Sequence, residues 1–244
     1  MLLLLIKNLV CGITNPVYWF GIWVTYRNYQ SVNPSQALKW TVKSVLAGLV
    51  SGNLGMLMVS GLGLSVQMGM YLALLFPAAL ILAKIRPRFC CFAYSGALLG
   101  ILGVGDARGI LAVVGLLHIM EGFLCMMGMA ESRQLVWRRA SLQNSTISKG
   151  CWPVPFALLV PGEASAGVIT MPGWWPLLGE GTYFSLFPMT ALILYQAEGG
   201  GRSGRLLGYG IMLLGMALIL GEGWLLQRLA LILMVFIHEW ILLE

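Results

Sequence analysis

Charged residues are scarce in this chain. Of its 244 residues only 10% are Asp, Glu, Lys or Arg, whereas 59% are hydrophobic. A soluble domain of this size could not cover its surface with so few charges, but a lipid bilayer requires none over most of the girth of a protein. The composition therefore excludes an ordinary soluble protein. It predicts a single transmembrane domain, residues 1–244, with the lipid bilayer as its main partner.

Residues that commonly perform catalysis are also few. The chain has two histidines, His118 and His238, and one aspartate, Asp106. A zinc metalloprotease helix needs His-Glu-x-x-His, but no second histidine follows His238 and Glu239. The chain also lacks a phosphate-binding P-loop, a dinucleotide-binding glycine fingerprint and Gly-x-Ser-x-Gly. These absences argue against the common soluble enzyme classes and predict no catalytic residues.

Cysteine usage points away from disulfides and cofactors. There are five cysteines, an odd number, and they are Cys11, Cys90, Cys91, Cys125 and Cys151. Most of them lie in or beside apolar segments, and the adjacent pair Cys90 and Cys91 has no common metal-ligand spacing. We interpret them as small packing residues and predict no cofactor. The net charge of +6 would suggest nucleic acid in a soluble protein. Here the placement of the charges is more informative, and no nucleic acid is expected.

Long hydrophobic runs are the dominant feature of the sequence. Runs close to the roughly 17–25 residues that span a bilayer alternate with short polar joints. They predict an all-α transmembrane bundle of about nine spans: Leu2–Tyr26, Val42–Leu64, Val66–Ala83, Phe89–Gly105, Gly109–Ala130, Trp152–Thr170, Thr182–Ala197, Leu206–Leu220 and Trp224–Leu242. The sixth contains Pro153, Pro155 and Pro161, so it could instead be re-entrant, which would leave eight spans.

The positive charges predict the orientation of this bundle. If the joints alternate sides, one side holds twelve Lys or Arg residues and the other only Arg108. The twelve are Arg27, Lys39, Lys43, Lys84, Arg86, Arg88, Arg133, Arg138, Arg139, Lys149, Arg202 and Arg205. The richer side is expected to be cytoplasmic. This places the N-terminus outside, the C-terminus inside, a basic cytoplasmic loop at 131–151 and an outer loop at 163–181.

Two loop features suggest contacts with the membrane. Trp174 and Trp175 in the outer loop are expected to anchor at the interface, where indole rings are favoured. Arg133, Arg138 and Arg139 in the basic loop suit anionic lipid headgroups. A docking surface for an acidic partner is the alternative for these three arginines.

Small residues recur at a spacing typical of close helix packing. Gly48 and Gly52 are four residues apart, as are Gly96 and Gly100. This spacing lets two membrane helices approach closely. With 31 glycines in the chain, some such pairs are expected by chance.

Two ionisable side chains lie within one predicted span. His118 and Glu121 are three residues apart, so they share one helical face, and that face should turn toward protein rather than lipid. The best complement elsewhere is His238 with Glu239. We interpret the residues as a polar pair that fixes helix packing. The alternatives are a zinc or iron site, a proton relay, or a hydrolytic site built from the same four residues.

Short motifs recur in an order that resembles a known family. They are Asn15-Pro16-Val17-Tyr18-Trp19 leading to Tyr26-Arg27, Arg88-Phe89-Cys90-Cys91-Phe92-Ala93-Tyr94-Ser95, Leu117-His118-x-x-Glu121-Gly122, Trp152-Pro153-Val154-Pro155, Trp174-Trp175-Pro176 and His238-Glu239-Trp240-Ile241. Together they resemble the membrane region of the MinJ-like, PDZ-domain-containing membrane proteins of Gram-positive bacteria. The resemblance extends over nearly the whole chain, and its motifs are structural rather than catalytic.

The resemblance implies a non-enzymatic adaptor in the bacterial plasma membrane. Such proteins act in division-site selection and link a polar, curvature-sensing scaffold protein to the membrane-bound Min ATPase system. Cytoplasmic division proteins are therefore the expected partners, and a homo-oligomer is compatible with this role. A cytoplasmic PDZ domain normally follows the last span, whereas this sequence stops at Glu244. The alternatives are a metal-dependent membrane enzyme or an ion- or proton-coupled transporter.

Overall fold

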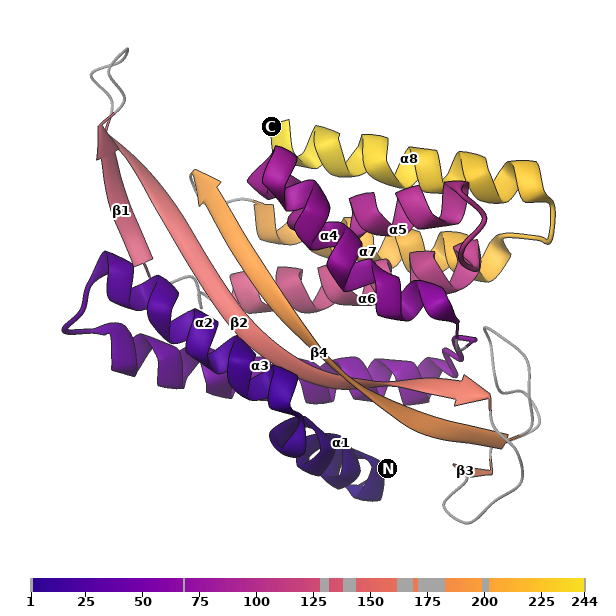
Figure 1. The fold of residues 1–244 in the computed structure, drawn as a ribbon, viewed down its shortest axis with the longest axis horizontal. Coiled ribbons are helices and arrows are strands. Elements are labelled where there is room, and N and C mark those ends of the chain that lie inside the picture. The colour runs from indigo at the N-terminus through magenta and orange to yellow at the C-terminus, as the bar shows by residue number, and fades with distance from the viewer. Residues whose placement is uncertain are drawn as a thin grey trace. The chain divides into compact units, whose positions relative to one another are not determined.

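The computed structural model describes residues 2–67, 69–127, 132–137, 144–161, 169–170, 183–198 and 202–243. The helices are α1 (Leu2–Thr14), α2 (Pro16–Val32), α3 (Ala37–Leu62), α4 (Met70–Ile85), the 3-10 helix η1 (Pro87–Cys90), α5 (Phe92–Ile101), α6 (Ala107–Met126), α7 (Arg202–Ile219) and α8 (Trp224–Leu243). The strands are β1 (Ser132–Trp137), β2 (Asn144–Pro161), β3 (Ile169–Thr170) and β4 (Tyr183–Glu198). Figure 1 labels the α-helices and the strands.

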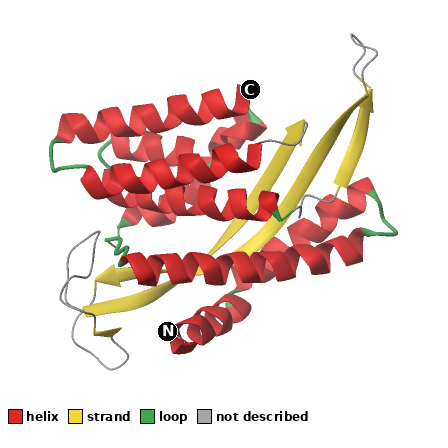
Figure 2. Cartoon of the chain, turned by 180° about the vertical axis from the view of Figure 1, so that it is seen from behind, coloured by secondary structure: helices red, strands yellow, loops and turns green. Residues whose placement is uncertain are grey.

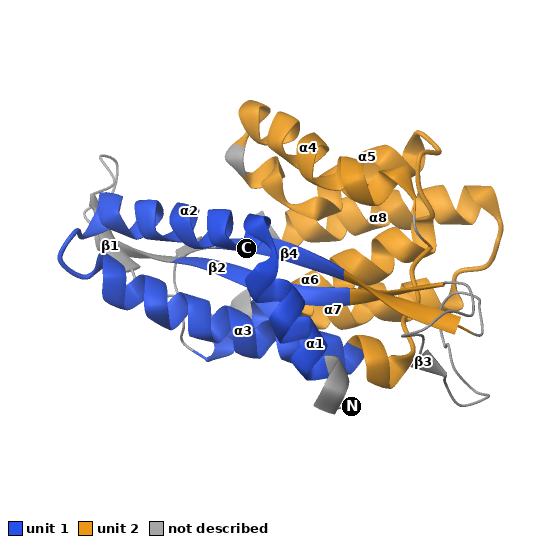
Figure 3. Ribbon diagram, turned by 60° about the horizontal axis from the view of Figure 1, so that its bottom comes forward, with its two compact units in different colours: residues 1–58, 120–157, 188–207 blue, residues 59–119, 158–187, 208–244 orange. Residues whose placement is uncertain are grey.

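The chain divides into two compact units, which Figure 3 colours separately. Unit 1 comprises Met1–Met58, Met120–Ala157 and Pro188–Leu207. Unit 2 comprises Val59–Ile119, Leu158–Phe187 and Gly208–Glu244. Because each unit takes three separate segments, residues far apart in the sequence meet inside it.

Two of the predicted membrane helices are β-strands. The structure has β2 and β4 where the sequence predicted helical spans at Trp152–Thr170 and Thr182–Ala197. Figure 2 shows them as long strands. They belong to a four-stranded sheet of order β1-β2-β4-β3, in which β1 pairs antiparallel with β2 and β3 with β4. The prediction of an all-α fold is therefore wrong.

Proline explains why β2 is not helical. Pro153 and Pro155 lack a backbone N–H, and each would cost roughly 3 kcal/mol inside a helix. In a strand the N–H groups of residues two apart point to the same side, so both missing donors fall on one edge of β2. The aromatic residues Tyr183, Phe184 and Phe187 likewise favour an extended backbone at the start of β4. Hydropathy measures apolar length and does not distinguish these conformations.

The predicted count of nine spans is also wrong. Within the described ranges, only α3, α6 and α8 contain stretches long and apolar enough to cross a membrane, at Ala37–Leu62, Ala107–Met126 and Trp224–Ile241. Helix α5 has 10 residues. At about 1.5 Å per residue it covers only half of a hydrocarbon core roughly 30 Å thick. The orientation inferred from charge depended on nine alternating crossings, so it stays a prediction.

The first predicted span is divided by a helix cap. Helix α1 ends at Thr14 and α2 begins at Pro16. Asn15 has an extended backbone, and its side-chain oxygen accepts a hydrogen bond from the Val17 N–H at 2.9 Å. Asn at the N-cap and Pro at the first helical position are both strong signals for a helix start. The apolar run Leu2–Tyr26 therefore contains two helices.

In unit 1 the glycines of α3 face a strand. A Cβ atom added to Gly48 would overlap the carbonyl oxygen of Pro153, and one added to Gly52 would overlap that of Pro155. The four-residue spacing of these glycines therefore makes room for the backbone of β2. The sequence had suggested that a second helix would pack there. Only glycine permits this approach, since any side chain would occupy the space of backbone atoms.

A buried polar network joins α2, α3 and β2 in the same unit. The Tyr29 hydroxyl lies 2.8 Å from Ser44 Oγ and accepts a hydrogen bond from the Cys151 N–H at 3.4 Å. The Cys151 thiol lies 3.3 Å from Thr25 Oγ1. Burial raises the pKa of Cys151 to about 11, although the Thr25 hydrogen bond partly offsets that rise. The thiol is therefore protonated at neutral pH and acts as a packing group.

In unit 2 the helices also approach through glycines. An added Cβ at Gly96 of α5 would lie 2.7 Å from Ile110 Cγ2 of α6. An added Cβ at Gly100 would overlap Leu231 of α8. Gly210 of α7 is packed similarly, since its added Cβ would lie 2.6 Å from the Gly115 carbonyl oxygen of α6. Close packing of α5, α7 and α8 around α6 brings their polar side chains into contact.

The start of α6 is capped and tied to α7. Asp106 Oδ2 accepts a hydrogen bond from the Gly109 N–H at 2.8 Å, so the only aspartate of the chain caps this helix. Arg108 Nε donates to the Ala217 carbonyl oxygen at 3.3 Å, near the end of α7. These contacts set where α6 begins.

Candidate metal centre

Three side chains from different helices of unit 2 converge on one point. Cys91 is the N-cap residue of α5, His118 lies in α6 and His238 lies in α8. One potential ligand atom from each residue lies within 4.8 Å of the others. Both histidines are buried, with 3% and 4% of their surfaces exposed. Two imidazoles and a thiolate are ligands typical of zinc.

The separations are close to those of a metal centre. With zinc bonds of about 2.0–2.3 Å, tetrahedral ligands lie roughly 3.3–3.6 Å apart. Cys91 Sγ and His118 Nε2 are 3.5 Å apart. The rings of His118 and His238 have centroids 5.1 Å apart and cross nearly at right angles. All three ligand atoms lie within 4.8 Å of one another, so binding one ion would draw them closer together.

The tautomer of His118 follows from its partner. His118 Nδ1 lies 2.8 Å from the carbonyl oxygen of Val114, one turn earlier in α6. A carbonyl oxygen can only accept a hydrogen bond, so Nδ1 carries the proton and donates it. Nε2 is then left with a lone pair that faces the sulfur of Cys91. This is the protonation state that metal binding through Nε2 requires.

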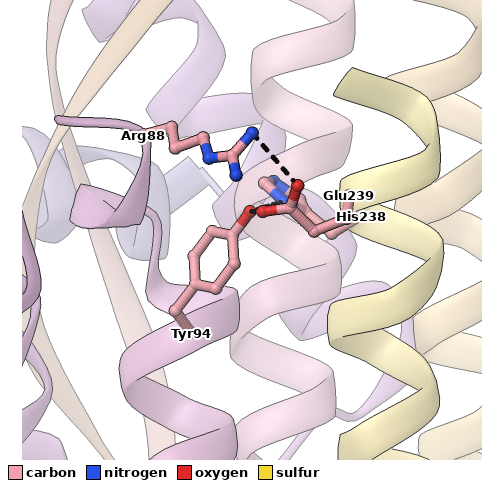
Figure 4. Close-up of polar contacts among 4 residues, drawn as sticks. All are labelled: Arg88, Tyr94, His238 and Glu239. Atoms are coloured by element: carbon pink, nitrogen blue, oxygen red, sulfur yellow. Dashed lines mark hydrogen bonds and ion pairs between the residues drawn. The ribbon is translucent and has the colours of Figure 1, made fainter. Parts of the chain in front are cut away.

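His238 is held in the same tautomer by a longer chain of contacts, shown in Figure 4. The Tyr94 hydroxyl donates to Glu239 Oε1 at 2.5 Å and lies 3.1 Å from His238 Nδ1. Because the single hydroxyl proton goes to the carboxylate, Nδ1 must donate to Tyr94. Arg88 forms an ion pair with Glu239 Oε2 at 3.3 Å. Both histidines therefore present a lone pair on Nε2.

The sulfur of Cys91 lies at a helix start. It accepts a hydrogen bond from the Ala93 N–H at 3.5 Å, in the first turn of α5. Backbone donors and the dipole at a helix N-terminus stabilise negative charge, as a metal-bound thiolate carries.

Tyr209 of α7 packs against both histidines. Its ring centroid lies 4.8 Å from that of His118 in an edge-on arrangement, and 5.7 Å from that of His238. Its hydroxyl donates to the Met234 carbonyl oxygen at 2.7 Å, which links α7 to α8. The aromatic ring reduces the polarity around the site and fixes the planes of the two imidazoles.

The structure brings together only some of the four residues that the sequence grouped. It places His118 beside His238. Glu239 reaches His238 through Tyr94 and is not among the three converging ligands. Glu121 follows His118 by three residues in α6 but belongs to unit 1.

The other predicted contact residues lie elsewhere. Arg133 is in β1, opposite Ser148 of β2. Arg138, Arg139, Trp174 and Trp175 lie outside the described residues.

Sequence reasoning missed Cys91, Tyr94 and Arg88 as site residues. Cys91 precedes its partner His118 by 27 residues, and Tyr94 precedes His238 by 144. Such separations leave no local spacing pattern to recognise. The available signal was the sequence Arg88 to Tyr94 itself, which places a basic residue, a thiol and a phenol at one helix start.

Comparisons with protein families, with curated proteins and with solved structures found no match to this chain. The MinJ-like resemblance therefore stays a prediction from short motifs. What this site can bind is therefore inferred from the positions of Cys91, His118 and His238.

Proposed function

We propose that this chain is a membrane protein that binds a divalent metal ion of the zinc type through Cys91, His118 and His238. The observation that carries the proposal is the convergence of these three ligand atoms within 4.8 Å of one another. One nitrogen or sulfur comes from each of α5, α6 and α8. A bound ion would therefore join three helices of unit 2.

The hydrogen bonds around the ligands support a metal site. Each imidazole donates its Nδ1 proton to an acceptor, which leaves Nε2 available, as in most protein sites where histidine binds a metal. The ligand set favours Zn²⁺, and imidazole with thiolate also suits Cu⁺. Three protein ligands leave the fourth tetrahedral position for water or another small ligand.

The alternative explanation of the cluster is packing without metal. In that case the Cys91 thiol donates a hydrogen bond to His118 Nε2, which fits their separation of 3.5 Å. This hydrogen bond would require neither a fixed tautomer of His238 nor the charged side chains of Glu239 and Arg88. The two explanations differ in whether a metal replaces the thiol proton.

Cobalt binding to the purified full chain tests the proposal. In detergent, one equivalent of Co²⁺ should bind and give a thiolate-to-cobalt charge-transfer band, because Cys91 supplies the sulfur. Cys91→Ser should lose the band and weaken binding by about 100-fold or more. Cys90→Ser, which changes the neighbouring thiol, should leave both unchanged. Absence of stoichiometric binding by the unmodified chain, or an unaltered band in Cys91→Ser, would contradict the proposal.

The ordered motifs favour a second function. We also propose a location in the bacterial plasma membrane and a role as a MinJ-like adaptor whose partners are cytoplasmic division proteins. The support is the order of the motifs along the sequence together with the three helices in the described ranges that are long and apolar enough to cross a membrane. A fluorescent fusion in the native cell should gather at division sites. Uniform membrane fluorescence, together with normal septum placement after deletion, would count against this role.

A further inference from the structure

The two histidines of the metal centre differ in what lies behind them. His118 donates to a backbone carbonyl within its own helix, and that acceptor cannot change its charge. His238 donates to Tyr94, which is bonded to the carboxylate of Glu239. Figure 4 shows Arg88 on the far side of that carboxylate. Of the two histidines, His238 is thus the one whose described hydrogen bonds lead, through Tyr94, to the charged pair of Glu239 and Arg88.

The charged end of this chain reaches the surface of the described structure. The side chain of Arg88 is 37% exposed and that of Glu239 24% exposed, whereas His238 is buried. The Tyr94 to Glu239 distance of 2.5 Å is that of a charge-assisted O–H···O⁻ hydrogen bond. A change in charge or position at Arg88 can therefore alter how strongly Tyr94 accepts the proton of His238.

We propose that Tyr94 is a positioning residue that sets the tautomer of His238, and that the Arg88 and Glu239 pair regulates metal affinity through it. The part concerning metal affinity depends on the function proposed above. The part concerning the tautomer does not, because it follows from the contacts of His238 alone. With Glu239 charged, Tyr94 donates to the carboxylate, His238 Nδ1 donates to Tyr94, and Nε2 is available to the ion. Loss of the group that accepts the N–H of a metal-binding histidine typically weakens metal affinity by about 10–100-fold.

Tyr209 provides a matched comparison for Tyr94. Both tyrosine rings pack against His238, with centroids 5.1 Å away for Tyr94 and 5.7 Å for Tyr209. The Tyr209 hydroxyl donates to the Met234 carbonyl oxygen and, within the described part of the chain, forms no hydrogen bond with a histidine nitrogen. Replacement of either tyrosine by phenylalanine removes one hydroxyl and keeps the ring. Only the Tyr94 change removes the acceptor of the His238 proton.

Nitrogen NMR of the metal-free full chain tests the tautomer directly. The chain has only two histidines, so ¹⁵N-histidine labelling reports on His118 and His238 alone. Both should show a protonated Nδ1 and an unprotonated Nε2. In Tyr94→Phe the His238 signals should shift toward the other tautomer while those of His118 stay fixed. In Tyr209→Phe neither histidine should change tautomer. An unchanged His238 in Tyr94→Phe would overturn the proposal.

Cobalt titration of the same variants tests the regulation. Tyr94→Phe should weaken Co²⁺ binding by about 10–100-fold and keep the charge-transfer band, since Cys91 is still present. Arg88→Gln should weaken it by at most about 5-fold, because the ion pair is partly exposed. Tyr209→Phe should bind as the unmodified chain does. Equal losses in the two tyrosine variants would reduce Tyr94 to a packing role and overturn the regulation.

The two measurements separate the two proposals. If the unmodified chain binds no cobalt but the tautomer of His238 depends on Tyr94, the proposed metal function fails and the positioning role stands. If cobalt binds but Tyr94→Phe changes neither the tautomer nor the affinity, the metal function stands and the positioning role fails.

Discussion

Gly52→Ala is expected to destabilise the protein by about 3 kcal/mol, the upper end of typical overpacking costs. The added Cβ would overlap the carbonyl oxygen of Pro155. Relief requires α3 or β2 to move, because the obstructing atom belongs to the backbone. The loss should appear as a lower unfolding temperature of the full chain in detergent.

Gly61→Ala is the matched control in the same helix. Apart from its own helix and chain neighbours, no atom of the described residues lies within 4 Å of a Cβ added there. Alanine favours helix over glycine by about 1 kcal/mol, so this variant should be as stable as the unmodified chain or slightly more stable. Equal unfolding temperatures for Gly52→Ala and Gly61→Ala would show that α3 and β2 do not pack as described.

His118→Ala is expected to lower metal affinity by about 100-fold or more, because it removes one of the three ligands. Changing a residue that only supports a ligand typically lowers metal affinity by about 10–100-fold. His118 Nε2 lies 3.5 Å from the sulfur of Cys91. Titration with Zn²⁺ or Co²⁺ measures the change, and circular dichroism confirms that the variant keeps its helices.

Glu121→Gln tests whether the carboxylate that the sequence paired with His118 belongs to the metal site. Glu121 lies three residues after His118 in α6 but outside the converging ligands. The variant should therefore bind metal as tightly as the unmodified chain. A comparable loss in Glu121→Gln would place the carboxylate in the site and would require a different ligand set.

The parts of the fold that sequence reasoning predicted well are long uninterrupted helices. The predicted spans Gly109–Ala130 and Trp224–Leu242 cover nearly the same residues as α6 and α8. Apolar length sufficed there because neither segment contains proline and a cap or loop borders each one. It failed at β2 and β4, whose backbones satisfy their hydrogen bonds with other strands. Strand pairing depends on residues distant in sequence, and hydropathy does not detect it.

The candidate site was only partly accessible from sequence. His118 and His238 stand out because the chain has no other histidine and both lie in apolar segments. Their spacing to neighbouring glutamates suggested Glu121 and Glu239 as partners, whereas the converging ligand atoms in the described residues are those of Cys91, His118 and His238. Cys91 was interpreted as a small packing residue, and Tyr94 was noted only as part of a motif in the predicted span Phe89–Gly105. Their roles depend on the glycines that bring α5 against α6 and α8, which the sequence showed only as a common spacing.

By itself the sequence determined the chemical character of this protein: an apolar chain with few charges, two histidines in apolar segments and glycines spaced for close packing. These properties follow from residue type and local order. Only the tertiary structure decided which helix ends meet, that β2 lies against the glycines of α3, and that Cys91 joins the histidines. The reason is that such contacts depend on backbone paths between distant residues. Hydrophobic burial, which drives folding, is non-directional and does not specify them.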